Sequence, residues 1–264
     1  MKLTPLTPRI TPLSCSSVRL KSWGSTGGSY KAPYWRFYWN REKGARVSFA
    51  GQVTELTPSK YLLIPANTDF RAQLLSPVTH FFAHFRAAPP YDQVEPGIYT
   101  YRARPDIRRL IAQVNACTGQ QSERADHRAS MALLALLHTA LAALPEDLLS
   151  FREPDDRIDK VLSHMATSLD SLCPNDELAA VAGMNTNAFI RRFHEVVGDS
   201  PQRYHLKQRI ERACLLLHFS PASIDQIAER TGFCDRFHFS RVFKRISGSS
   251  PAAFRRKAVS ETVA

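Results

Sequence analysis

The chain has 264 residues, of which 44% are hydrophobic and 22% charged, and its 35 basic side chains outnumber its 24 acidic ones to give a formal charge of +11. This balance excludes a disordered or fibrous protein, and the length predicts two domains, since a domain takes roughly 100 to 200 residues. The basic excess admits nucleic acid, an anionic membrane surface or an acidic partner without choosing among them.

The N-terminal residues and the cysteines bear on the compartment. Prolines and charges interrupt residues 1–20, where a secretory signal needs an unbroken apolar run of about 7 to 15 residues, so we expect a cytoplasmic protein. The five cysteines are scattered and form no CxxC pair, which argues against a disulfide framework and a zinc site. We expect reduced thiols, no metal and no cofactor.

Short segments rich in aromatic and β-branched residues fill the first hundred positions, and turn residues separate them, which predicts an all-β sandwich or small barrel. The expected strands are 35–40, 45–49, 52–56, 60–64, 70–75 and 78–85. From Pro105 the spacing of apolar residues becomes helical, and a second helix is expected over 122–144.

The most apolar stretch runs from Met131 to Leu144, which is shorter than the roughly 20 residues that span a bilayer, so no membrane partner is expected. A helix contact between two subunits and burial against the protein's own sheet both explain this stretch.

Prolines and acidic residues between Pro145 and Pro154 indicate a linker, after which the periodicity is entirely helical. The expected helices are 156–168, 175–182, 186–197, 201–218, 223–230, 235–246 and 251–257. The sequence thus predicts an α+β protein. Its parts are a β-rich domain over 1–104, a helical dimerisation or linker region over 105–150, and an all-α domain over 151–264.

An internal repeat lies in the helical part. Gly183 matches Gly232 at an offset of 49, and Phe193 matches Phe243 at an offset of 50, because the second copy has one extra residue in its turn. Each copy reads helix, glycine-containing turn, helix, which is the arrangement that places a second helix in the major groove of DNA. The two units span about 175–197 and 224–247.

Each second helix carries two phenylalanines four residues apart, which must share a buried face and leave the opposite face outside. The outward side chains suit base edges, since Arg pairs with guanine, Asn with adenine, and Phe or Ile contacts a thymine methyl. The candidate DNA contacts are Asn187, Ile190, Arg191 and His194 in the first unit, and Arg236, Phe237, His238, Ser240, Arg241 and Lys244 in the second. A solvated charged face would explain the basic residues of a lone helix, but the duplication favours DNA reading.

Charge distribution supports the same interpretation. Residues 151–185 hold 3 basic and 7 acidic side chains, whereas residues 186–258 hold 14 and 6. Ser200 and Ser250 each precede a proline that opens a helix, and the free N–H groups at a helix start favour a DNA phosphate. Serine capping alone accounts for these two positions equally well.

The segment GFCDRFHFSRVFK from Gly232 to Lys244, followed by GSSPAAFR, resembles the second helix-turn-helix of the AraC/XylS family of bacterial transcription regulators, and the resemblance extends roughly from Arg157 to Arg256. It implies two reading helices joined by the long helix 201–218 and inserted into successive major grooves on one side of the duplex. The implied base contacts are Asn187, Ile190 and Arg191, then Arg236, His238, Ser240 and Arg241. Ile190 replaces a residue that is often polar, so the first helix is expected to read bases less strongly.

The resemblance also implies that residues 1–104 form a cupin-like effector-binding domain. It further implies an effector-responsive activator that forms a homodimer and works with RNA polymerase on a promoter. Such a regulator is expected on the nucleoid when bound to double-stranded DNA.

Candidate effector contacts in the N-terminal half are Arg36, Tyr38, Trp39, His80 and His84, because aromatic faces suit a sugar ring or a planar organic molecule. On a strand, Arg36 and Tyr38 face one way and Trp39 the other, and a packed core explains the same residues. A cupin-type metalloenzyme is one alternative, although an HxH pair with a following Glu is missing. A non-specific nucleic-acid-binding protein is another. We expect a non-enzymatic, sequence-specific regulator.

Overall fold

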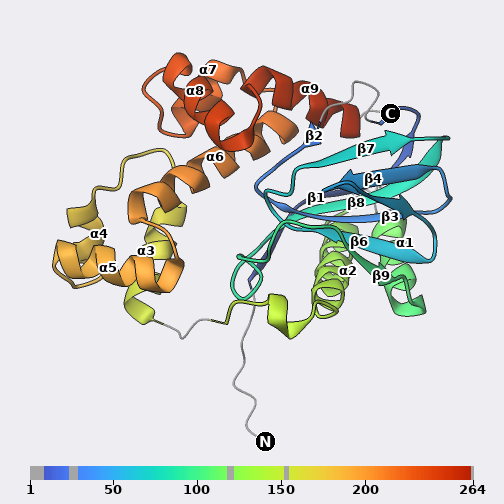
Figure 1. The fold of residues 1–264 in the computed structure, drawn as a ribbon, viewed down its shortest axis with the longest axis horizontal. Coiled ribbons are helices and arrows are strands. Elements are labelled where there is room, and N and C mark those ends of the chain that lie inside the picture. The colour runs from blue at the N-terminus through green and yellow to red at the C-terminus, as the bar shows by residue number, and fades with distance from the viewer. Residues whose placement is uncertain (1–8, 24–28, 118–121, 152–154, 263–264) are drawn as a thin grey trace, which may run out of the picture. The chain divides into compact units, whose positions relative to one another are not determined.

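The computed structural model describes residues 9–23, 29–117, 122–151 and 155–262 (Figure 1). The chain divides into two compact units, one of residues 1–151 with 259–264 and the other of residues 152–258. All the strands of the described residues lie in the first unit, and the second is helical. The predicted α+β class is confirmed.

In the described part of the first unit, nine strands form two antiparallel sheets (Figure 1). One has the order β1-β8-β3-β6-β9, and the other has the order β2-β7-β4-β5. The strands are β1 (Ile10–Leu20), β2 (Ser29–Tyr30), β3 (Trp35–Asn40), β4 (Ala45–Phe49), β5 (Gln52–Leu56), β6 (Lys60–Ile64), β7 (Phe70–Leu74), β8 (Val78–Ala87) and β9 (Tyr99–Arg102).

The strand β1 was not predicted, and its composition explains why. It is rich in serine and contains Pro12, which cannot donate a hydrogen bond to a neighbouring strand. The structure accommodates the proline because β1 lies at the edge of its sheet and its register with β8 shifts between Pro12 and Ser14. The short strands β2 and β9 were also missed, whereas the six predicted strands are all present.

Alternate residues of β3 enter two different cores, as the two-residue period of a strand requires. Trp35 and Phe37 belong to the core between the five-stranded sheet and the helices, whereas Tyr38 belongs to the core between the two sheets. Both faces of this central strand are therefore buried, and a side chain on β3 meets protein whichever way it points.

The helices α1 (Pro105–Cys117) and α2 (Glu123–Leu141) cover one face of the five-stranded sheet (Figure 1). The Ser122 hydroxyl accepts a hydrogen bond from the N–H of Ala125 at 3.1 Å and so caps the start of α2. Leu136, Leu137 and Leu141 of α2 are buried in the core beneath that sheet. The apolar side of α2 is thus buried in its own unit.

The predicted linker begins after Leu144 with the short 3-10 helix η1 (Glu146–Leu148), and its residues 152–154 lie outside the described part of the chain. The helices that follow are α3 (Asp156–Thr167), α4 (Asn175–Val181), α5 (Thr186–Val197), α6 (Pro201–Phe219), α7 (Ile224–Arg230), α8 (Arg236–Ser247) and α9 (Pro251–Thr262). Their starts and ends agree with the predictions to within one residue, except that α9 extends beyond the expected Lys257.

None of the helices within the described residues has both the length and the apolar character needed to cross a membrane. The five cysteines all lie within the described residues and form no disulfide bond, and Cys234 is the exposed one.

Candidate nucleic-acid interface

The repeat predicted from the sequence is a repeat of structure. The helix pair α4 and α5 forms one helix-turn-helix unit, and α7 and α8 form the other. The turn of each unit contains a glycine in the left-handed region, with φ of 64° at Gly183 and 72° at Gly232. Both values are ones that glycine adopts without the steric penalty of a Cβ atom.

The second helix of each unit is capped in the same way. The Asn185 side chain accepts a hydrogen bond from the Ala188 N–H at 2.9 Å, and the Asp235 side chain accepts one from the His238 N–H at 2.7 Å. At the other end each helix stops at a left-handed glycine, Gly198 or Gly248. Matching caps give α5 and α8 the same length of 12 residues.

Two phenylalanines fix the inward face of each of these helices. The rings of Phe189 and Phe193 lie 5.6 Å apart in α5, those of Phe239 and Phe243 lie 5.5 Å apart in α8, and all four side chains are fully buried. Since side chains four residues apart share a helix face, the side of each helix opposite these rings must face outward.

The first helix-turn-helix unit presents a small outward surface. Asn187, Arg191 and His194 are exposed, while Ile190 is half-buried and packs against the core of its unit. The Arg191 guanidinium lies 3.9 Å from the Glu195 carboxylate, and because both side chains are well exposed this pair contributes little to stability. The guanidinium therefore stays available to a partner.

The second helix-turn-helix unit presents the larger outward surface. Phe237 is 78% exposed, which is unusual for a phenyl ring in an ordered helix, and Arg241 and Lys244 are exposed along the same side. Arg236 and His238 are exposed near the helix start, while Ser240 is half-buried. The structure thus brings the six residues predicted for this unit onto the accessible side of one helix.

A buried arginine supports the turn of the second unit. Arg209, on α6, donates from Nε to the Thr231 carbonyl oxygen at 2.6 Å, and its guanidinium lies 4.3 Å from the centre of the Phe233 ring. Burial lowers the pKa of Arg209, because the charged form loses its hydration. Gly232 approaches the backbone of Asp170 so closely that a Cβ atom there would lie 2.8 Å from the carbonyl carbon.

A second cluster of charged side chains connects α3 to α5, the second helix of the first helix-turn-helix unit. The buried Asp155 caps α3, and its carboxylate accepts hydrogen bonds from Arg157 at 3.1 Å and from Arg192 of α5 at 2.7 Å. The hydrogen bonds from Arg157 and then Arg192 hold the pKa of the Asp155 carboxyl well below its usual range. The sequence did not predict these roles of Asp155 and Arg209, because Arg192 lies 37 positions from Asp155 and Thr231 lies 22 positions from Arg209.

The two serines that precede α6 and α9 cap those helices. The Ser200 hydroxyl accepts from the Arg203 N–H at 3.4 Å, and the Ser250 hydroxyl accepts from the Ala253 N–H at 3.3 Å. Capping is thus the role that the structure gives these side chains, and phosphate contact at the two helix starts stays a prediction.

The predicted effector residues lie on two faces of the five-stranded sheet. Arg36 on β3 lies opposite His84 on β8. Four of the predicted residues are buried, namely Arg36, Tyr38, His80 and His84. The rings of Tyr38 and His80 lie 4.8 Å apart. Trp39 does not join them, because it packs against the helix-side core and its Nε1 donates to the Pro58 carbonyl oxygen at 3.1 Å.

Charged and polar groups in this interior are surrounded by aromatic rings. The Arg36 guanidinium lies 4.9 Å from the centre of the Tyr34 ring and 5.2 Å from that of Phe70. The Nδ1–H of His80 donates to the Asn40 side-chain oxygen at 2.7 Å, and burial lowers the pKa of His80 to about 3. His80 is therefore neutral at physiological pH.

A family model described as a helix-turn-helix domain matches residues 178–257, which include all of the second helix-turn-helix unit and the first unit except the start of α4. The MmsAB operon regulatory protein of Pseudomonas aeruginosa is 31% identical over 121 residues, which are 46% of this chain and 39% of that protein. The transcriptional activator RhaS of Escherichia coli O6:H1 is 29% identical over 158 residues, which are 59% of this chain and 55% of that protein. The matches thus span less than two thirds of these relatives.

The fold of the whole chain is similar to that of ToxT from Vibrio cholerae O395, with a TM-score of 0.57 at 14% identity, over 93% of this chain and 97% of ToxT. Another ToxT structure, which contains an unsaturated fatty acid, has a TM-score of 0.56 at 12% identity, over 97% of each chain. These likenesses support the two-part architecture. The duplicated helix-turn-helix domain and its likeness to these regulators support a transcription regulator of the AraC/XylS type.

Proposed function

We propose that the protein is a sequence-specific DNA-binding transcription regulator that inserts α5 and α8 into successive major grooves on one side of a duplex. The observation that carries this proposal is the repetition of one outward-facing helix in two units built alike, with matched caps and matched buried phenylalanines. Two successive grooves on one side of B-DNA lie one helical turn apart, which a duplicated reading unit suits.

The outward side chains offer the contacts that base reading needs. Arg241 on α8 and Arg191 on α5 are exposed donors that suit guanine O6 and N7, and the exposed ring of Phe237 suits a thymine methyl group. Asn187 suits adenine. Because Ile190 is half-buried, we expect α8 to contribute more of the sequence specificity than α5.

We further propose that the β-rich unit binds a small-molecule effector at Arg36, Tyr38, His80 and His84. A buried guanidinium among aromatic rings suits a carboxylate-bearing organic molecule, and the rings also suit a sugar. By analogy with its family, the protein would act in the cytoplasm as a homodimeric activator in contact with RNA polymerase.

Selection of oligonucleotides by the purified full-length protein tests DNA reading and supplies the target site. With that site, Arg241→Ala and Arg236→Ala should each weaken discrimination against mismatched DNA by about 1 to 3 kcal/mol. Lys160→Ala is the matched control, because it removes one positive charge from an exposed position on α3. It should change binding to all sequences little and equally.

Three outcomes would contradict the proposal. Unchanged footprints in both arginine variants would remove α8 from the reading surface. Equal affinity for selected and scrambled duplexes at matched salt would indicate a non-specific nucleic-acid-binding protein. Stoichiometric metal in the β-rich unit together with substrate turnover would indicate a cupin-type metalloenzyme.

Effector binding is tested by the shift in melting temperature that sugars and carboxylate compounds produce, with an unsaturated fatty acid such as ToxT binds among them. Arg36→Lys keeps the positive charge and loses the planar fork, so a carboxylate effector should bind it more weakly. Equal shifts in the parent and in the variant would exclude Arg36 from effector binding.

A further inference from the structure

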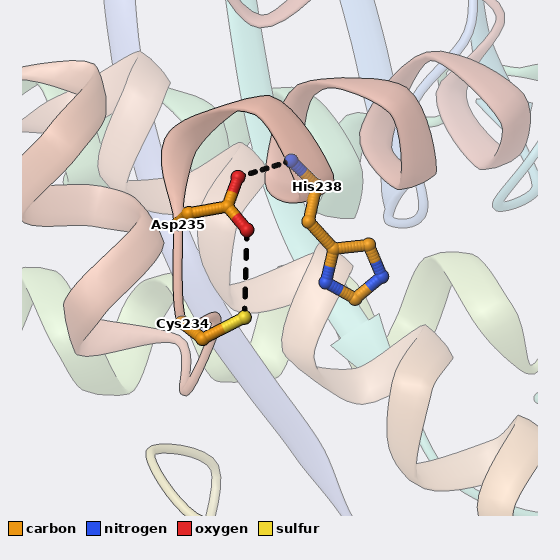
Figure 2. Close-up of side chains that lie close together, drawn as sticks. All are labelled: Cys234, Asp235 and His238. Atoms are coloured by element: carbon orange, nitrogen blue, oxygen red, sulfur yellow. Dashed lines mark hydrogen bonds between the residues drawn. The ribbon is translucent and has the colours of Figure 1, made fainter.

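Three side chains with different metal-binding atoms meet at the start of α8 (Figure 2). The Cys234 sulfur, an Asp235 carboxylate oxygen and a His238 ring nitrogen all lie within 4.8 Å of one another. Cys234 directly precedes the capping residue, and His238 lies one helical turn further on. All three are exposed, and within the described residues they are the one such group of three or more.

We propose that this cluster binds a divalent, thiol-preferring metal ion of the zinc class, and that the ion lowers the affinity of α8 for its DNA site. Thiolate sulfur, imidazole nitrogen and carboxylate oxygen are the three donor types that zinc takes from proteins. Three protein ligands leave a fourth position for water. Zinc–ligand bonds are about 2.0 to 2.3 Å long, so ligand atoms already this close need only small side-chain rotations.

The carboxylate can serve the helix and the ion together. Its Oδ1 accepts the capping hydrogen bond from the His238 N–H at 2.7 Å, while its Oδ2 lies 3.5 Å from the Cys234 sulfur, which donates to it. Figure 2 shows the second oxygen turned toward the sulfur.

The histidine is held near the other two ligands by a neighbouring ring. The rings of His238 and Phe233 form a T-shaped pair with their centres 5.6 Å apart, and Phe233 is itself covered by the Arg209 guanidinium. A positive helix start and Arg236 beside it disfavour a cation. The thiolate and the carboxylate offset this, because binding releases the thiol proton to solvent and two negative ligands then balance the divalent ion.

Metal and DNA would compete for one side chain, and this step rests on the proposed function. His238 is among the residues proposed to contact bases, and an ion on its ring removes that nitrogen from the groove. The net charge of the cluster changes only from −1 to 0, so attraction to phosphates changes little. The loss should therefore fall on specific binding. By linkage, specific DNA must weaken metal binding by the same factor.

The metal site is tested first without DNA. Full-length protein, reduced and stripped of metal with a chelator, is titrated with Co²⁺ and then with Zn²⁺. We expect one equivalent of Co²⁺ with a thiolate-to-cobalt charge-transfer band, which Zn²⁺ abolishes by displacement. Cys234→Ser should lose the band, and Asp235→Asn, which keeps a capping side chain, should weaken it. Cys117→Ser, at a half-exposed thiol outside the cluster, should retain it. Absence of the band, or an undiminished band in Cys234→Ser, would overturn the site.

The coupling is tested with the selected duplex. One equivalent of Zn²⁺ should raise the Kd of the parent protein for that duplex roughly tenfold and leave Cys234→Ser within about twofold of its metal-free value. A parent Kd that Zn²⁺ does not change, although the cobalt titration shows a filled site, would overturn the coupling. Failure to bind any selected duplex in metal-free buffer would contradict the proposed function instead, and the cobalt titration would still decide the metal site.

Discussion

Gly183 and Gly232 occupy matching turns with nearly equal φ values, yet their surroundings differ. A Cβ atom at Gly183 would meet nothing within 4 Å, whereas one at Gly232 would lie 2.8 Å from the Asp170 backbone and 3.1 Å from the Arg209 side chain. The sequence predicts both turns from the glycines alone. The close approach could not be predicted, since it depends on how the segment before α4 packs against the second unit's turn.

Alanine substitutions separate these two effects. Gly183→Ala should lower the free energy of unfolding by about 1 to 2 kcal/mol, because it places a side chain in the left-handed region. Gly232→Ala should cost roughly a further 1 to 3 kcal/mol, because backbone atoms must also move. Urea denaturation measures both values. Equal losses in the two variants would show that the contact with Asp170 carries no cost.

His80 should make the stability of the β-rich unit depend on pH. Burial lowers its pKa to about 3 in the folded protein, against about 6.5 in an unfolded chain. The unfolded state therefore binds the proton first, and the stability present above pH 6.5 is lost progressively as the pH falls toward 3.

A variant without the imidazole isolates this effect. From pH 7 to pH 5.5 the parent should lose about 1 kcal/mol more free energy of unfolding than His80→Gln, which keeps an amide for the Asn40 side chain. Denaturant unfolding at the two pH values measures it. The same pH dependence in both proteins would mean that His80 is accessible to protons in the folded state.

At the scale of elements, the sequence predicts the helices and strands whose residue periodicity and flanking cap or turn residues indicate the same boundaries. The helix α5 begins and ends where its spacing and its flanking Asn185 and Gly198 indicate. The strand β1 shows the limit, because serine and Pro12 hide a strand that β8 holds by pairing along its length. Pairing with a distant strand leaves no local signal in the sequence.

The attachment of α5 to α3 rests on Asp155, and it supplies a prediction about this pair of helices. Asp155→Asn keeps a side chain that can cap α3 and removes the charge that Arg157 and Arg192 contact. The free energy of unfolding should fall by about 1 to 3 kcal/mol, because both guanidinium groups lose a charged partner but stay hydrated.

Lowering the pH should reduce the free energy of unfolding of the parent protein in the same way. The folded pKa of Asp155 lies below its unfolded value of about 3.9, so the stabilisation is complete above that value and is lost as the pH falls below it. Asp155→Asn lacks this contribution. A variant as stable as the parent at pH 7, by thermal and urea unfolding, would show that the arginines do not hold the helices together.

At the scale of the whole molecule, the positive charge is concentrated in two places. Residues 186–258 hold 14 basic and 6 acidic side chains, and residues 1–150 hold 18 and 10. The first excess includes α5 and α8, the two helices proposed to read DNA. The sequence alone assigns this excess of positive charge to the helix-turn-helix units, because a duplicated unit repeats its residue pattern at a fixed offset.

The candidate sites differ in how many of their residues the sequence predicts. The outward faces of α5 and α8 follow from helical periodicity, and the structure places all ten predicted residues at exposed or half-buried positions. In the β-rich unit, strand alternation predicts which residues share a face but not what covers that face. The grouping of Cys234, Asp235 and His238 was not predicted, because the absence of a CxxC pair says nothing about a cluster of three different ligand types.

Base-contact footprinting of the full-length protein on its selected site tests the central claim most directly. Two protected major-groove segments should lie about 10 base pairs apart on one side of the duplex. Arg191→Ala should weaken protection of one segment, and Arg241→Ala should weaken protection of the other. A single protected segment, or loss of both segments equally in either variant, would contradict the claim that α5 and α8 read successive grooves.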